Sequence, residues 1–244
     1  MALTALIFGG IAGAATLAGT ALVRWKQDLV TRYSHYVNSF AAGALITIAL
    51  VHLIPESIEL TDNALLAVLG SFIVFYLLEA SVVYHACSAI HFTETCPRDI
   101  HTKGPVIFSG LFLHSLVDGV VITAGFEVSL ELGLLAATGV ILHELPEGIT
   151  SFALLMQSMS RKTALILSIA VALATPVGAA IALGPLSGLS EAGVGIMIAI
   201  AAGSFLYVAA SDLIPETHEK DILQNVTFLL TGVGLLYLLG VLFN

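Results

Sequence analysis

The sequence predicts an all-α integral membrane protein, an eight-transmembrane-helix bundle with an inverted repeat around a central pair of helices. Three observations lead to this prediction: an apolar composition, eight long apolar runs, and a segment that occurs twice. Hydrophobic residues make up 58% of the 244-residue chain and charged residues only 10%, whereas soluble domains carry about 25% charged residues. We therefore expect a single transmembrane domain over residues 1–244 that lies in a lipid bilayer.

The eight apolar runs each approach or exceed the length that a helix needs to cross the hydrocarbon core, about 20 residues. Their ranges are 2–23, 36–55, 64–86, 104–126, 132–156, 163–183, 192–214 and 223–243. The first run has no basic segment before it and is too long for the core of a signal peptide, so we count it as a span. The connections are short apart from a polar loop at about 87–103, and they do not suggest a separate soluble domain.

Basic residues fall only in the odd-numbered loops of this scheme. They are Arg24, Lys26 and Arg32 in loop 1, Arg98 and Lys103 in loop 3, Arg161 and Lys162 in loop 5, and Lys220 in loop 7. The positive-inside rule then predicts odd-numbered loops in the cytoplasm and both termini outside. We expect the membrane to be the cell (plasma or inner) membrane. A formal net charge of −9 disfavours nucleic acid as a partner and favours cations.

One segment occurs twice, in spans that cross the membrane in opposite directions. Residues 41–57 and 201–217 match at eight of 17 positions, including Leu-Ile-Pro-Glu at 53–56 and 213–216. This pattern predicts an inverted repeat of the kind found in secondary transporters, with spans 1–3 and 6–8 as its halves and spans 4 and 5 between them.

The proline in each copy should loosen its helix, and charged groups stand beside it. We interpret them as candidate cation contacts at the two mouths of a pathway: His52 and Glu56 at the outer mouth, and Asp212 and Glu216 at the inner one. Ordinary helix termination at the membrane surface is the alternative interpretation. Glu79 in span 3 is a further intramembrane acid, which either lines the inner exit or pairs with a loop base.

Spans 4 and 5 carry ionisable groups deep in the membrane. Each contains H-x-x-x-[D/E]-G, from His114 to Asp118 and from His143 to Glu147, with Glu144 beside His143. This spacing puts an imidazole and a carboxylate on one helix face, near the midplane at 1.5 Å per residue. Each carboxylate costs at least about 2.5 kcal/mol there, and every Lys and Arg is in a loop. A divalent cation would satisfy both kinds of group; protonated carboxyls in a hydrogen-bond network or a proton relay are the alternative.

Two other functions remain open for such a site. The stretch from His143 to Glu147 is similar to the H-E-x-x-H motif of zinc hydrolases, with Glu144 as the general base and His114 as a further ligand. That motif needs a second histidine where Glu147 stands, and Pro146 interrupts its helix. The inverted repeat favours transport, so we do not expect an enzyme. A membrane metal sensor that does not transport is the other alternative, and it predicts binding without flux.

With H-S-L-V-D-G in span 4, H-E-L-P-E-G in span 5 and the LIPE endings, the chain resembles the ZIP (Zrt/Irt-like) family of metal-ion transporters over essentially its whole length. The resemblance implies transport of Zn²⁺ or a similar divalent ion toward the cytoplasm by a homodimer. It also implies a set of metal ligands: His114, Ser115, Asp118, His143, Glu144 and Glu147.

Two positions depart from the family pattern. Ser115 stands where Asn is frequent, and Thr175 precedes Pro176 where many members have Glu-Pro. The departures favour one metal held by His114, His143 and Glu147, with Asp118 and Glu144 completing or flanking the site. Nitrogen and oxygen ligands suit Zn²⁺, Cd²⁺, Fe²⁺, Mn²⁺, Co²⁺ and Ni²⁺, and their spacing does not rank these ions. We expect no organic cofactor. The 87–103 loop is either a cytosolic metal-sensing loop, as the family suggests, or a plain solvated loop.

Overall fold

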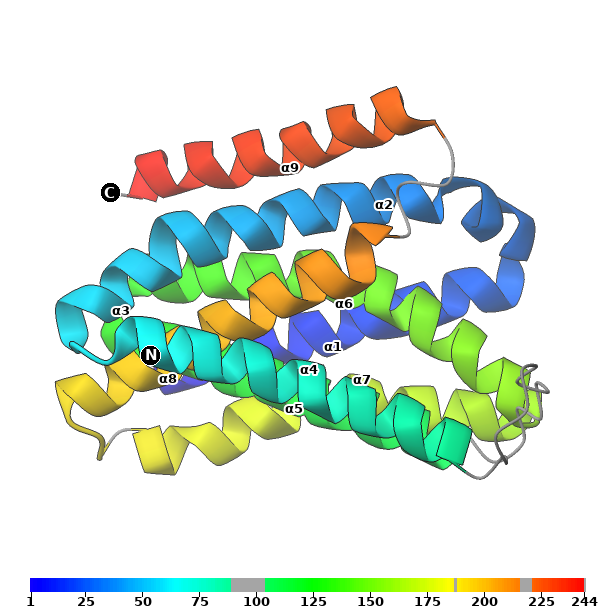
Figure 1. Ribbon diagram of the computed structural model, residues 1–244, viewed down its shortest axis with the longest axis horizontal. Coiled ribbons are helices and arrows are strands. Elements are labelled where there is room, and N and C mark those ends of the chain that lie inside the picture. Colours follow the sequence, from blue (N-terminus) through cyan, green and yellow to red (C-terminus); the bar gives the residue numbers. More distant parts are fainter. Residues whose placement is uncertain (89–103, 187, 216–220, 244) are drawn as a thin grey trace.

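A computed structural model describes residues 1–88, 104–186, 188–215 and 221–243, without the side chains of a few of them, Glu79 and Asp212 included. The helices lie roughly along a common direction (Figure 1). Their bounds are α1 Ala2–Trp25, α2 Gln27–Thr47, η1 Ile48–Leu53, α3 Ile54–Leu60, α4 Ala64–Ser88, α5 Gly104–Val128, α6 Leu130–Ser158, α7 Arg161–Leu186, α8 Glu191–Val208, η3 Ala209–Leu213 and α9 Ile222–Phe243.

Seven helical stretches within the described residues are long and apolar enough to cross a membrane. An eighth helix, α4, has 25 residues, and its first part, Ala64–Leu78, is apolar but shorter than a span. The predicted all-helical membrane bundle is confirmed, while the exact count of eight spans stays a prediction. Four basic residues expected in loops lie in helices, because these helices continue beyond the apolar runs: Arg24 at the end of α1, Arg32 in α2, and Arg161 and Lys162 at the start of α7.

Both copies of the repeated segment contain a π-helical turn just before the proline. The amide of Ile54 donates to the carbonyl of Ala49, and the amide of Ile214 donates to the carbonyl of Ala209 at 3.0 Å. Each is an i to i−5 bond, which adds one residue to the turn. The wider turn accommodates a proline ring that would otherwise clash with a carbonyl of the preceding turn. The loosening predicted at Pro55 and Pro215 therefore takes the same form in both copies.

The helices pair in two sets, and each set contains two equivalent contacts, as expected of a protein with two related halves. In one set, α1 packs along α6 and α7 packs along α5; in the other, α2 packs on α9 and α8 packs on α4. Figure 1 shows α9 beside α2 at one edge of the bundle. Gly43 of α2 lies against the backbone at Leu229 of α9, and Gly203, at the equivalent position of α8, lies against the backbone at Val68 of α4. Small residues allow such close helix contacts in membranes. These pairings support the inverted repeat, and they put α5 and α6 at its centre.

Candidate metal centre

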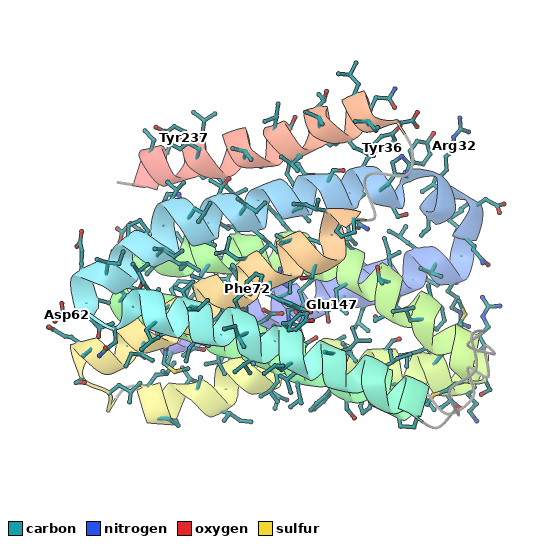
Figure 2. All side chains as sticks on the ribbon, viewed as in Figure 1. Arg32, Tyr36, Asp62, Phe72, Glu147 and Tyr237 are labelled. Atoms are coloured by element: carbon teal, nitrogen blue, oxygen red, sulfur yellow. The ribbon has the colours of Figure 1, made fainter. Side chains whose placement is uncertain are left out.

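The four groups that the span-4 and span-5 motifs align are brought together where α5 meets α6. His114 and Asp118 come from α5, and His143 and Glu147 come from α6. One ligand atom from each of these four lies within 4.8 Å of all the others. Figure 2 places Glu147 near the middle of the bundle, between Asp62 at one end and Arg32 at the other, as the predicted midplane depth requires.

Asp118 is the centre of this cluster. Its carboxylate is fully buried, and its Oδ2 lies 3.2 Å from Nε2 of His143 and 3.3 Å from Nε2 of His114. The same His114 nitrogen is 3.8 Å from Oε2 of Glu147. Neither Asp118 Oδ1 nor Glu147 Oε2 has a hydrogen-bond partner among the described residues. Buried carboxylate oxygens are normally satisfied, so these four groups are arranged to meet a positively charged species.

The backbone of α6 fixes which nitrogen of His143 faces the cluster. Nδ1 of His143 lies 3.0 Å from the carbonyl oxygen of Gly139, and a carbonyl only accepts, so Nδ1 is the nitrogen that donates. In a neutral imidazole Nε2 then carries a lone pair, and this lone pair faces the Asp118 oxygen. Two electron-rich atoms facing each other are stable only with a cation or a proton between them. Histidines that ligate metals are oriented in the same way, because their second ring nitrogen donates its hydrogen to a neighbouring acceptor such as a backbone carbonyl.

Ser115 and Glu144, the other two predicted ligands, lie beside the cluster. The hydroxyl of Ser115 donates to Oε1 of Glu147 at 2.8 Å, so it contacts a carboxylate of the cluster. Glu144 is fully buried and accepts from two hydroxyls, that of Thr16 on α1 and that of Thr175 on α7, the latter at 2.5 Å. The structure therefore groups four of the six predicted ligands and places Glu144 in a separate contact of α1, α6 and α7. The ligand roles themselves stay predictions.

Sequence reasoning missed the residues that surround these groups. Thr16 gave no signal, because a single threonine in an apolar helix is unremarkable, and Thr175 was noted only as a departure from a family pattern. Two aromatic rings were also missed. Phe75 of α4 stands edge-on to the His114 ring, with centroids 6.0 Å apart, and Phe205 of α8 stands edge-on to the His143 ring at 5.7 Å. These rings pack against the two imidazoles and form part of their apolar surroundings.

The candidate pathway residues are not part of the four-residue cluster. The ring of His52 lies against Gly240 of α9, in the contact between η1 and α9, and half-buried Glu56 lies in the first turn of α3. Glu216 and the side chains of Asp212 and Glu79 lie outside the described residues, as do residues 89–103 of the predicted loop.

Comparisons with a family model and with individual known proteins agree with each other. The sequence model of a family described as ZIP zinc transporter matches residues 93–240, more than half of the chain. The mouse zinc transporter ZIP4 is 38% identical over 133 residues, 54% of this chain and 20% of that protein. Rat ZIP4 is 28% identical over 277 residues, 83% of this chain and 42% of that protein. Mouse zinc transporter SLC39A7 is 33% identical over 158 residues, 60% and 33% of the two chains. The chain thus spans less than half the length of these relatives.

Proposed function

Because the chain belongs to the ZIP zinc transporter family, we propose that it carries a divalent metal ion, Zn²⁺ first of all, across the membrane toward the cytoplasm. The observation that carries the proposal is the cluster of His114, Asp118, His143 and Glu147 at the meeting of α5 and α6. Nε2 of His143 and Nε2 of His114 both face one carboxylate oxygen of Asp118 there, and a cation between these atoms would be coordinated by all of them.

The donor set of the cluster suits zinc. Two nitrogen and two carboxylate ligands match the tetrahedral N and O coordination that Zn²⁺ adopts in proteins. The relatives described above are named zinc transporters, which supports the same ion. Cd²⁺, Fe²⁺, Mn²⁺, Co²⁺ and Ni²⁺ accept the same donors and belong in any test of selectivity.

In the proposed mechanism, the side chains of the cluster replace the water molecules bound to the ion. The ion is released on the other side of the membrane when the two repeats rock around it. His143, held by the Gly139 carbonyl, is the fixed ligand, and Ser115 holds Glu147 in position. Glu144 flanks the site through Thr16 and Thr175. The proposed waypoints outside the centre remain His52 and Glu56 on the outer side, and Glu79, Asp212 and Glu216 on the inner side.

Three further points belong to the proposal. We place the protein in the cell membrane, and the charge distribution supports both termini outside and the odd-numbered loops in the cytoplasm. The ZIP resemblance supports a homodimer in the lipid bilayer with one pathway in each subunit. One ion rather than two at the centre is supported by the position of Glu144, whose two oxygens already accept hydroxyl hydrogens.

The hydrolase alternative requires Glu144 to act as a general base on a water molecule. A carboxylate with both oxygens engaged by threonines is poorly placed for that role, so the geometry disfavours a hydrolase. The metal-sensor alternative shares the cluster and differs only in the absence of flux.

The deciding experiment measures Zn²⁺ and Cd²⁺ flux into proteoliposomes. The intact protein should show saturable flux, His143→Ala should abolish it, and His35→Ala should retain it as the matched control. His35 is suitable because it lies on α2 beside Asp221, away from the cluster. Folded protein that binds zinc but moves none of the six divalent ions would overturn the transport proposal in favour of the sensor. Release of peptide or lipid products would favour the hydrolase.

A further inference from the structure

A second polar feature lies at the end of the bundle, where α1 ends and α7 begins. An open pocket of about 590 Å³ there is lined by Arg24, Trp25, Phe152, Arg161, Lys162 and Leu165. None of these residues belongs to the metal cluster. The pocket lies at the ends of two candidate membrane spans, Ala2–Trp25 and Arg161–Leu186. In a bilayer, the ends of spans lie at the level of the lipid headgroups.

The rim of the pocket is positively charged. Arg24, Arg161 and Lys162 are all exposed, and none of them forms an ion pair with a carboxylate within the part of the chain that the structure describes. An Nη2 hydrogen of Arg161 is donated to the carbonyl of Arg24 at 3.0 Å, which holds this guanidinium beside the end of α1. The N-terminus of α7 adds the partial positive charge of its free amides. The rim is therefore suited to an anion.

The floor of the pocket is apolar. The Phe152 ring is fully buried and Leu165 is half-buried, while the Trp25 ring beside them is 74% exposed. Tryptophan is enriched at the headgroup level because its ring is apolar and its N–H is polar. A free inorganic anion would gain nothing from this floor, whereas a phospholipid offers a phosphate to the rim and glycerol and acyl carbons to the floor. Basic pockets between membrane helices bind anionic headgroups in this way.

We propose that the pocket of Arg24, Arg161 and Lys162 binds the phosphate of an anionic phospholipid in the leaflet predicted to face the cytoplasm. The phosphate oxygens accept hydrogens from the two guanidinium groups and the ammonium group, and the Trp25 ring lies beside the lipid backbone. The binding is independent of the metal cluster and of transport.

The test compares two double variants that each remove two charges from the same predicted side of the membrane. Arg161→Gln with Lys162→Gln removes two rim cations, and Lys26→Gln with Arg32→Gln is the matched control outside the pocket. Each protein is placed in nanodiscs of mixed phosphatidylglycerol and phosphatidylcholine, and the lipids that stay bound after extraction are counted by native mass spectrometry. We expect phosphatidylglycerol to be enriched on the intact protein and on the control. The rim variant should lose the enrichment by about fivefold for each cation removed.

A charge-preserving variant and a check of the fold complete the test. Arg161→Lys with Lys162→Arg preserves the charge and should preserve the enrichment, and Zn²⁺ binding by every variant shows that the fold is intact. Equal retention of the two lipids by the intact protein, or equal loss in the rim and control variants, would overturn the proposal. Inorganic phosphate that protects the delipidated protein against heat as well as phosphatidylglycerol does would identify a free anion as the ligand, and would also overturn it.

Discussion

The role of a single carboxylate in this protein depends on which neighbours reach it. Glu144 and Glu147 are three residues apart on α6, yet one accepts hydroxyl hydrogens from two other helices and the other faces the imidazole of His114. The i to i+4 rule could align His143 with Glu147 from the sequence, because both lie on one helix. It could not place Thr16 and Thr175 beside Glu144, because that contact joins residues from three different helices.

We expect Thr16→Val combined with Thr175→Val to lower the stability of the protein. Valine keeps the shape of threonine but leaves the buried Glu144 without its two hydroxyl donors, and hydrogen bonds to charged groups contribute about 1.5–3 kcal/mol each. The double variant should therefore unfold at a lower temperature in detergent. The Thr→Ser pair, which retains both hydroxyls, is the control. Equal unfolding temperatures for the valine and serine pairs would show that Glu144 does not depend on these donors.

Ser115 provides a test of the surroundings of the metal cluster. Ser115→Ala removes the hydroxyl that donates to Glu147, and loss of a group that orients a ligand weakens metal binding by about 10–100-fold. The matched control is Ser109→Ala, because the Ser109 hydroxyl donates to the carbonyl of Pro105, one turn back on the same helix, and Ser109 is not part of the cluster. Calorimetric titration with Zn²⁺ should show weaker binding for Ser115→Ala alone. Unchanged affinity would mean that Glu147 needs no support from Ser115.

At the level of the helices, close contacts explain why certain positions are glycine. A Cβ at Gly203 would collide with the carbonyl oxygen of Val68, whereas one at Gly234 would meet open space. We expect Gly203→Ala to destabilise the protein by about 1–3 kcal/mol through overpacking. Gly234→Ala should be neutral or slightly stabilising, because alanine is the better helix former by about 0.5–1 kcal/mol. Thermal unfolding of the two variants in the same detergent measures the difference, and similar shifts would argue against the α4–α8 contact.

Most of the helices could be predicted from the sequence, and the errors have physical causes. Hydrophobic runs located the spans because the bilayer selects for apolar length, but they missed the helix that continues beyond the apolar parts, where Arg24, Arg32, Arg161 and Lys162 lie. The prolines indicated where two helices loosen, although the π-turns that result depend on backbone geometry that residue types do not encode. Spacing aligned the two clustered groups within each helix, whereas the aromatic contacts of Phe75 and Phe205 depend on tertiary packing.

For the whole molecule, the charge distribution predicts which end faces which side. In a background with Cys87 and Cys96 replaced by serine, Ser160→Cys should react with a membrane-impermeant maleimide only from the cytoplasmic side. Glu127→Cys should react only from outside. Both positions are exposed. Glu127 lies in the last turn of α5, just before α6 begins, and Ser160 follows the other end of α6. Labelling of the two cysteines from the same side would contradict the bundle topology. Labelling of Ser160→Cys only from outside and of Glu127→Cys only from the cytoplasmic side would reverse the predicted orientation.

The cluster at the α5–α6 contact has a mechanical consequence. Each helix supplies two of its four groups, so an ion bound there is a crosslink between α5 and α6. Since α5 packs along α7 and α6 packs along α1, the crosslink also ties these two pairs of helices together. With an ion bound as proposed, the protein should be stiffer and more resistant to heat than the ion-free protein, by an amount set by the ratio of ion concentration to Kd.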